Sequence, residues 1–270
     1  MPWRQLAKMV RDRLIFTGQL LFTLLVAAFL IVPAGLSIAA GVTVNYFRGI
    51  QSGLTLQWIA QVWELYAGTI VSSFVVAFAT LAITLLAGVP AAYALLIRGG
   101  RVARMIEEII TLPVAVPGLA IALALLLTYG GFGAFRRSWL FIVVGHVVFT
   151  MPFMVRSVMA VFATVDIKTL DEGGASLGAP AWRRFWDIIV PNGIPGILAG
   201  SLMVVTLSLG EFNLTWMLHT PLTKTLPIGL ADSYASMRLE VASAYTLVFF
   251  VMIIPLLIAM QWIAERRGVR

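Results

Sequence analysis

The segment DIKTLDEGGASLGAPAWRRFWDIIVPNGIP, residues 166–195, is a polar stretch that interrupts an otherwise very apolar chain. Thr169 followed by Glu172 fits a capping box, in which the two side chains satisfy backbone N–H groups at the start of a helix. Gly178 suits the end of that helix, and Pro180 suits the first turn of a second one. The segment therefore predicts two short helices with a break between them.

The second of these helices is amphipathic. Its apolar face is formed by side chains at positions i, i+3, i+4 and i+7, which are Trp182, Phe185, Trp186 and Ile189. Its other side carries Arg183, Arg184 and Asp187. Two short amphipathic helices between membrane spans are typical of a docking platform for a partner protein.

The composition is that of an integral membrane protein. Of the 270 residues, 60% are hydrophobic and only 11% are charged, whereas soluble domains carry about 25% charged residues. The chain has no cysteine, which excludes disulfides and thiolate metal sites. The net charge of +7 indicates positively charged cytoplasmic loops and not a nucleic-acid partner. The basic, then apolar N-terminus is interpreted as a retained first span.

Hydrophobic runs predict an all-α membrane protein with about six membrane-spanning helices, each long enough to cross a bilayer. These cover residues 15–40, 66–97, 106–128, 139–163, 196–218 and 242–264. An interfacial helix is expected before the second span, and Pro113 and Pro117 are expected to kink the third. The expected organisation is an N-terminal part (1–65), a core (66–264) that contains the central loop (164–195), and a short basic tail (265–270).

The basic residues predict the orientation in the membrane. Six spans put both termini on one side, and 14 of the 19 Lys and Arg residues then fall on that side. These are Arg4, Lys8, Arg11, Arg13, Arg98, Arg101, Arg104, Arg156, Lys168, Arg183, Arg184, Arg266, Arg267 and Arg270. The other five are Arg48, Arg136, Arg137, Lys224 and Arg238. Because basic residues are enriched in cytoplasmic loops, both termini and the central loop are expected in the cytoplasm.

The sequence offers no catalytic site. It has no Gly-rich phosphate loop ending in Gly-Lys-Ser/Thr, no HExxH and no Gly-X-Ser-X-Gly. The two histidines, His146 and His219, are not at zinc-ligand spacing. An enzyme requires a nucleophile, a base and an electrophile in one constellation. We therefore expect no catalytic residues, no metal site and no cofactor.

Glu211 is an exception in an apolar interior. It shares a helical face of the fifth span with Ser208 and Thr215, and His146 lies at a similar depth in the fourth span. A carboxylate there costs about 2.5–3.5 kcal/mol on insertion scales, so it should face a cavity or a partner. The hypothesis is that these four residues line a translocation pathway. The alternatives are that Glu211 is solvated at the interface or caps a helix end, and that His146 is a packing histidine.

The central loop resembles the EAA loop of ABC importer permeases. That pattern is Glu-Ala-Ala, then Gly four residues after the second Ala, then a hydrophobic-X-Leu-Pro ending. Here it reads Glu172-Gly173-Gly174, then Gly178, then Ile188-Ile189-Val190-Pro191. The spacings match, but two glycines replace the alanines, at about 1 kcal/mol of helix stability each, and Val190 replaces Leu. Residues 88–98, 112–118 and 151–156 also look like the family, which extends the likeness over roughly residues 66–264.

The resemblance implies the type I importer fold and several partners. A permease of this kind pairs with a second permease, here expected to be a different chain, and with two ATPase subunits, and a substrate-binding protein supplies its cargo. It resides in the bacterial inner membrane. By this likeness, Glu172, Gly173, Gly174, Gly178 and Pro191 couple the chain to an ATPase. Residues 208–212 and 225–229 are most similar to the polyamine, ferric iron and small-oxyanion permeases.

Other interpretations stay open at this point. Glu172 could be only a helix-capping residue. The chain could be a self-contained secondary transporter or channel with Glu211 in its pathway, which would require internal repeats or several intramembrane ionisable residues. An intramembrane enzyme is a third possibility, against which the missing catalytic constellation argues.

Overall fold

The computed structural model describes residues 2–268, and the regular elements in this range are helices. The long ones are α1 (Pro2–Ala40), α2 (Gln57–Arg98), α6 (Trp139–Thr164), α9 (Val190–Gly210) and α12 (Leu239–Gly268). The short α-helices are α3 (Gly100–Thr111), α4 (Gly118–Tyr129), α5 (Gly133–Arg136), α7 (Ile167–Ser176), α8 (Ala181–Arg183), α10 (Asn213–Leu218) and α11 (Leu226–Ala235). Two 3-10 turns, η1 (Gly49–Ser52) and η2 (Leu112–Ala115), and one π segment, η3 (Arg184–Ile189), complete the described chain.

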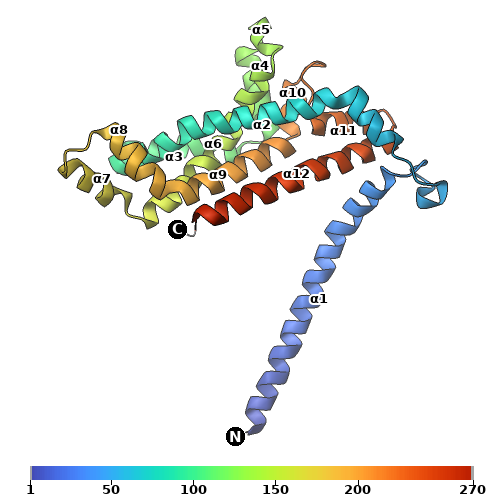
Figure 1. The fold of residues 1–270 in the computed structure, drawn as a ribbon, viewed down its shortest axis with the longest axis horizontal. Helices are drawn as coiled ribbons and strands as arrows, with labels where there is room; N and C mark the ends of the chain where they lie inside the picture. The colour runs from blue at the N-terminus through green and yellow to red at the C-terminus, as the bar shows by residue number, and fades with distance from the viewer. Residues whose placement is uncertain (1, 269–270) are drawn as a thin grey trace.

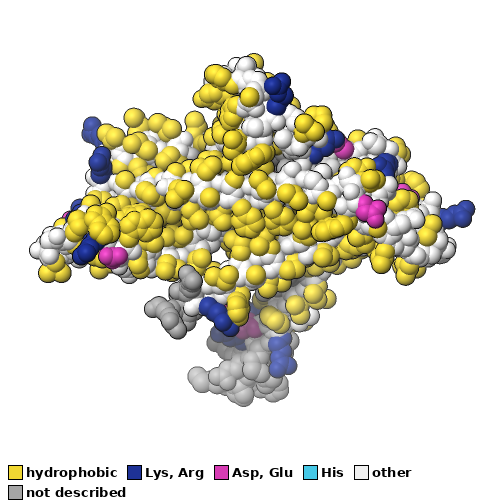
Figure 2. All heavy atoms as spheres, turned by 45° about the horizontal axis from the view of Figure 1, so that its top comes forward, with side chains coloured by type: hydrophobic (Ala, Val, Ile, Leu, Met, Phe, Trp, Pro, Cys, Tyr) yellow, Lys and Arg dark blue, Asp and Glu magenta, His cyan; other side chains and the backbone are white. Residues whose placement is uncertain are grey.

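Helices α2, α6, α9 and α12 lie side by side in one bundle, and α1 points away from it (Figure 1). Figure 2 shows hydrophobic side chains over the middle of this bundle and charged side chains mostly toward its ends. Among the described residues, five helices are long and apolar enough to cross a membrane, and the number is up to six if a bent pair of helices counts as one span. The prediction of an all-α protein with about six spans is confirmed, and α6 matches its predicted span within one residue.

The second span is longer than predicted. The expected interfacial helix and the span after it form one continuous helix, α2, of 42 residues. Between Gln57 and Pro90 the sequence has no proline, so nothing removes a backbone hydrogen bond there. At 1.5 Å per residue, α2 is about 63 Å long, twice the thickness of the hydrocarbon layer of roughly 30 Å. The helix therefore extends well beyond the bilayer core.

The third predicted span, residues 106–128, is broken. The helical segments Gly100–Ala115 and Gly118–Tyr129 meet at an angle of 108°. Val116 at the break is extended, with φ −98° and ψ 130°, because the residue before a proline is pushed out of the helical region. Pro117 then caps α4. The prolines expected to kink one helix thus separate two helices, and α4 rises out of the bundle (Figure 1).

The fifth predicted span, residues 196–218, is shifted and interrupted. A continuous helical run of 30 residues extends from Ala181 to Gly210, so the second helix of the central loop and the span form one rod. The run ends at Gly210, and Glu211 is extended, with φ −71° and ψ 122°. Helix α10 follows as a separate element. The other span ends are also longer than predicted, as α1 begins at Pro2 and α12 runs to Gly268. Arg270 of the predicted basic tail lies outside the described residues.

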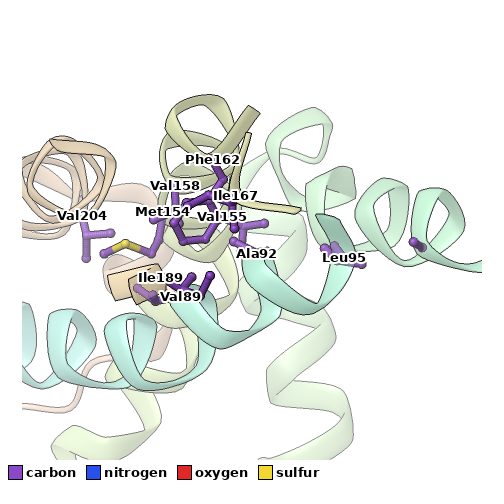
Figure 3. Close-up of a cluster of buried hydrophobic side chains, with 11 residues drawn as sticks. Val89, Ala92, Leu95, Met154, Val155, Val158, Phe162, Ile167, Ile189 and Val204 are labelled. Carbon is purple, nitrogen blue, oxygen red and sulfur yellow. The ribbon is translucent and has the colours of Figure 1, made fainter. Parts of the chain in front are cut away.

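One core cluster of the bundle lies where α2, α6 and α9 meet (Figure 3). Side chains of α2 and α6 such as Val89, Met154 and Phe162 form this cluster, together with Ile189 and Val204 from the helical run that includes α9. Gly196 and Gly200 let α9 approach α6, because an added Cβ would lie 2.7 Å from the Ser157 carbonyl oxygen and 2.8 Å from the Met154 sulfur. Small residues one turn apart are typical of close helix packing in membranes.

Candidate functional site

The first helix of the central loop is α7, and Gly178 ends it. Gly178 has φ +80°, a left-handed conformation that costs glycine nothing. The Gly178 N–H donates to the Ala175 carbonyl (2.9 Å), and the Ala179 N–H donates to the Gly174 carbonyl (3.0 Å). This pair of bonds is a Schellman motif. The predicted helix end at Gly178 and the predicted break before a second helix are confirmed.

The predicted capping box is wrong. Helix α7 begins at Ile167, two residues before Thr169, and its N-cap Asp166 makes no side-chain capping bond. The Thr169 hydroxyl instead donates to the Asp166 carboxylate at 2.6 Å. Glu172 therefore lies in the interior of α7, with its side chain exposed. The capping role offered as the alternative for Glu172 is not observed.

The prediction of an apolar face on the second helix is correct for two of its four residues. Ile189 is buried and Phe185 packs against the same core cluster, but Trp182 and Trp186 are 63% and 59% exposed. The reason is the π segment η3, whose i→i+5 bonds rotate successive side chains differently from an α-helix. Leu177 in the preceding turn is 90% exposed. The central loop thus exposes Leu177 and Trp182 near the turn that joins its helices, whereas Trp186 lies beside Leu86 and Pro90 of α2.

The residues expected to contact an ATPase occupy two environments. Gly173 is exposed like Glu172, with open space where a Cβ would be, and Pro191 is exposed at the start of α9. Gly174 is buried against the loop itself, because an added Cβ would lie 2.8 Å from Ile188 Cδ1 and 3.1 Å from Arg184 Cδ. The close approach at Gly174 is therefore to the second helix of the same loop.

A buried polar cluster in the loop, the Asp171 network, was missed by the sequence reasoning. Asp171 is 6% exposed, and its Oδ1 accepts hydrogen bonds from the Tyr93 hydroxyl (2.7 Å) and from Arg184 Nε (2.8 Å). Burial alone would raise the pKa of Asp171, but the bonds from Arg184 and Tyr93 and the charge of Arg184 hold it below its usual value. The sequence carried only a weak signal for this cluster, because it showed no more than an acid and an arginine in one loop. The helical pattern also predicted that Arg184 faces solvent.

A second polar cluster, the Glu211 network, joins the four residues predicted to line a pathway. His146 in α6 is 1% exposed. Its Nδ1 lies 2.7 Å from Ser208 Oγ in α9, and its Nε2 lies 2.8 Å from Thr215 Oγ1 in α10. Thr215 Oγ1 in turn lies 3.4 Å from Glu211 Oε2. With the imidazole proton on Nε2, each of these four side chains has a hydrogen-bond partner in the network.

Glu211 caps the short helix α10, as the alternative interpretation of this residue anticipated. Its carboxyl oxygens accept the backbone N–H groups of Leu214 (3.0 and 3.1 Å) and Thr215 (3.2 Å). It also borders the first residue of α4, because an added Cβ on Gly118 would lie 3.5 Å from Glu211 Oε1. The breaks in the third and fifth predicted spans therefore meet at this carboxyl group.

The C-terminal end of α10 is bound by a positively charged side chain, that of Arg136. Arg136 Nη1 donates to the Leu218 carbonyl at 2.8 Å, and its guanidinium lies 5.2 Å from the centre of the Phe141 ring. A cation at a helix C-terminus and a carboxyl group at its N-terminus both match the helix dipole. The sequence reasoning assigned Arg136 only to an outer loop.

The described residues contain no group of three or more His, Cys, Asp or Glu side chains arranged to hold a metal ion. The fold is that of a helical membrane protein with two broken helices within the bundle and a polar loop between its long helices.

The comparisons with known proteins agree with this class. Residues 84–269 match the family described as the binding-protein-dependent transport system inner membrane component. The molybdenum transport system permease protein ModB of Haemophilus influenzae is 30% identical over 179 residues, which is 60% of this chain and 77% of that protein. PhnV of Salmonella typhimurium, named for 2-aminoethylphosphonate transport, is 25% identical over 85% of this chain and 82% of its own length. The sulfate transport system permease protein CysW of Synechocystis is 26% identical over 60% of this chain and 63% of its own length.

The chain belongs to the family of binding-protein-dependent transport system inner membrane components. It is a multi-pass protein of the bacterial inner membrane and the permease subunit of an ABC importer, and it works with ATPase subunits, a binding protein and another permease. The predicted family, fold and general function are confirmed. The chain is a transport subunit and not an enzyme, which removes the intramembrane-enzyme interpretation and argues against a self-contained transporter.

Proposed function

We propose that the central loop is the surface through which an ATPase subunit drives this permease. Glu172, Gly173, Gly178 and Pro191 contact the ATPase directly, and Gly174 shapes the loop that presents them. The observation that carries this is the exposed surface at the turn between the loop helices, where Leu177 and Trp182 flank the turn and Glu172 is exposed in α7. Exposed large apolar side chains near a charged group are typical of a protein interface.

The orientation and the assembly follow from this role. The central loop and both termini lie in the cytoplasm, which the distribution of basic residues supports. The complete importer contains two ATPase subunits and a second permease of different sequence. Each permease then offers one central loop to one ATPase.

The transport cycle is alternating access driven from outside this chain. ATP binding closes the two ATPases and moves the central loop. Because α8, η3 and α9 form one helical run, this movement passes along α9 toward the Glu211 network. The bundle then opens toward the outer side. ATP thus biases a two-state element from a distant site.

Glu211, Ser208, Thr215 and His146 form the part of the pathway that opens and closes. They lie where the broken third and fifth spans meet, and broken helices within membranes line cavities or ion paths in many transporters. The Glu211 carboxyl group is already occupied by two backbone N–H groups, which argues against a role as a cation ligand.

The cargo is a small oxyanion. The three relatives described above are named for molybdenum, 2-aminoethylphosphonate and sulfate transport. This favours the anion class over the polyamine and iron classes that the sequence also allowed. Uptake of radiolabelled sulfate, molybdate and spermidine into vesicles that contain the whole importer tests the class. Uptake of spermidine alone would refute it.

The docking role is tested by ATP hydrolysis in the complex that copurifies with this chain. Glu172→Ala and Gly178→Asp should lower cargo-stimulated hydrolysis by about tenfold or more, within the range of coupling between distant sites. Two matched control variants test whether the loss of hydrolysis is specific to the loop. Glu64→Ala changes an exposed acid of α2, and Gly99→Asp changes another glycine with positive φ, +54°, and open space around it.

If the control variants lose stimulation as strongly as the loop variants, the loop has no special role. If no ATPase copurifies with the wild-type chain and transport continues without one, the proposed coupling is refuted.

A further inference from the structure

The Asp171 network connects the central loop to a helix that the chain does not attach to it. The loop continues covalently from α6 on one side and into α9 on the other. Helix α2 is separated from it by more than 65 residues of sequence, yet the Tyr93 hydroxyl of α2 donates to Asp171 in α7 at 2.7 Å. The Tyr93 ring also packs on Phe185 of η3, with ring centres 5.6 Å apart.

Asp171 also holds the two arms of the loop together. Its Oδ1 accepts Arg184 Nε of η3 at 2.8 Å, and Arg184 Nη1 donates to the carbonyl of Ala179 in the turn at 2.9 Å. Gly174, one turn after Asp171, packs directly against the Arg184 side chain. A single carboxylate oxygen therefore joins α2, α7 and η3, and Arg184 extends the connection to the turn.

The burial of this network makes it stiff. Asp171 is 6% exposed, and the Arg184 side chain is 19% exposed. Ile167 and Ile189 of the loop share one core cluster with Val89 and Ala92 of α2. A charge-assisted bond in such surroundings is stronger than one in water, and losing one partner leaves a buried group unsatisfied. The loop and the inner end of α2 consequently have one favoured relative position.

We propose that Tyr93, acting through Asp171, is a positioning residue for energy coupling that makes α2 move with the central loop. This inference rests on the proposed function of the loop as the ATPase contact. When the ATPase moves the loop, α2 is pulled directly through the Tyr93–Asp171 bond, in addition to the pull on α6 and α9 through the chain. This proposal also gives a role to residues 88–98. That segment resembles the permease family, but docking of the loop alone assigns it no function.

The test is the transport stoichiometry of the whole importer reconstituted in vesicles. Tyr93→Phe removes one hydroxyl and keeps the ring that packs on Phe185. We expect normal copurification of the ATPase and nearly normal basal hydrolysis, but at least about fivefold less cargo transported per ATP hydrolysed. Tyr234→Phe is the matched control, because Tyr234 is 64% exposed in α11, far from the loop. Asp171→Ala combined with Tyr93→Phe should be no worse than Asp171→Ala alone, because each change removes the Tyr93–Asp171 bond.

A distance measurement distinguishes a coupling role of Tyr93 from a purely structural one, because a structural role would not make the distance depend on ATP. The chain has no native cysteine, so spin labels can be placed at Ser176→Cys in α7 and Leu86→Cys in α2, both exposed. In the wild type, the distance between these labels should stay constant when ATP is trapped on the complex. In Tyr93→Phe the distance should change on ATP trapping.

The outcomes separate this inference from the proposed function. Wild-type transport per ATP in Tyr93→Phe, a wild-type label distance that changes on ATP trapping, or loss of the ATPase subunit from Tyr93→Phe would each overturn the role of Tyr93. Absence of any ATP-driven transport in the wild-type importer would instead overturn the proposed function. Reduced transport per ATP with the ATPase retained supports the inference.

Discussion

Asp171 and Glu211 are both carboxyl groups held by hydrogen bonds, but their partners lie at very different distances along the chain. Asp171 accepts from Tyr93 and Arg184, which are 78 and 13 residues away. Glu211 accepts from Leu214 and Thr215, three and four residues away. The first carboxylate therefore joins separate elements, whereas the second caps the helix that follows it.

This difference bears on which parts of the molecule can move. The bonds of Asp171 break if α2, α7 and η3 separate, so they hold these three elements in one relative position. The bonds of Glu211 to α10 survive any motion that carries Glu211 and α10 together. A shift of α10 against α6 is resisted by the hydrogen bond between His146 and Thr215 and by the packing of Leu214 and Leu218 on α6. Under the roles proposed above, the end of the bundle at Asp171 suits force transmission, and the break at Glu211 suits opening and closing.

The largest expected effect comes from Arg184→Ala. This change leaves the Asp171 carboxylate, which is 6% exposed, without its charged partner, and an unpaired buried charge is strongly destabilising. The central loop should lose its fixed structure and become sensitive to limited proteolysis, while the spans remain intact. Arg183→Ala is the control, because Arg183 is its exposed neighbour in sequence. Equal protease sensitivity of the two variants would mean that the Asp171 network does not stabilise the loop.

A smaller effect is expected from His146→Leu. The change removes the common partner of the Ser208 and Thr215 hydroxyls, and an unsatisfied buried polar group costs about 1–3 kcal/mol. The midpoint of thermal unfolding of the purified permease should fall, and adding Ser208→Ala should recover part of the loss. His219→Leu, at the less buried histidine, should have less effect. An unchanged midpoint in His146→Leu would show that these hydroxyls find other partners.

Glu211→Gln should act more weakly and more locally. Glutamine keeps one acceptor oxygen, so the cap of α10 should weaken by about 1 kcal/mol or less. Hydrogen exchange measured by mass spectrometry should speed up at the amides of Leu214 and Thr215 and stay unchanged in α7. Faster exchange in α7 would contradict the distinction between a local cap and a link among elements.

The smallest expected effect is that of pH on the Asp171 network. Because folding lowers the pKa of Asp171 below its usual 3.8, this carboxylate stabilises the loop fully above that value. The stabilisation is lost as the pH falls through the lowered pKa. Limited proteolysis of the loop should therefore be constant from pH 8 to about pH 5, and the wild type should approach Asp171→Asn only in stronger acid. A change near neutral pH would mean that another group controls the loop.

The apolar composition and the hydrophobic runs were enough to predict an all-α membrane protein, and α6 was placed almost to the residue. The ends and breaks of the other helices were harder to predict. Pro117 signalled a kink, but whether a proline bends or separates a helix depends on what satisfies the freed carbonyl groups. Gly210 gave little warning that a helix ends there, because glycine is common within membrane helices.

The candidate site was predictable to a similar degree. Glu211, Ser208, Thr215 and His146 do lie close together, although the helix expected to carry three of them is interrupted at Glu211. The Asp171 network could not be found in this way, because Tyr93 and Arg184 meet Asp171 only through tertiary packing. The rotated face of the second loop helix was missed because a π segment leaves no periodic signal of its own.

The π segment at Arg184–Ile189 also has a consequence for chain length. An i→i+5 bond encloses one more residue than an i→i+4 bond, so deleting one residue here would let the run from Ala181 to Gly210 become a regular α-helix. A π segment absorbs its extra residue by turning less per residue, so the helix on either side keeps the direction it would have in a regular α-helix that is one residue shorter. Trp182 and the turn at Gly178 should therefore keep their present direction after such a deletion. The chain can gain or lose one residue at this place without changing how the turn is presented.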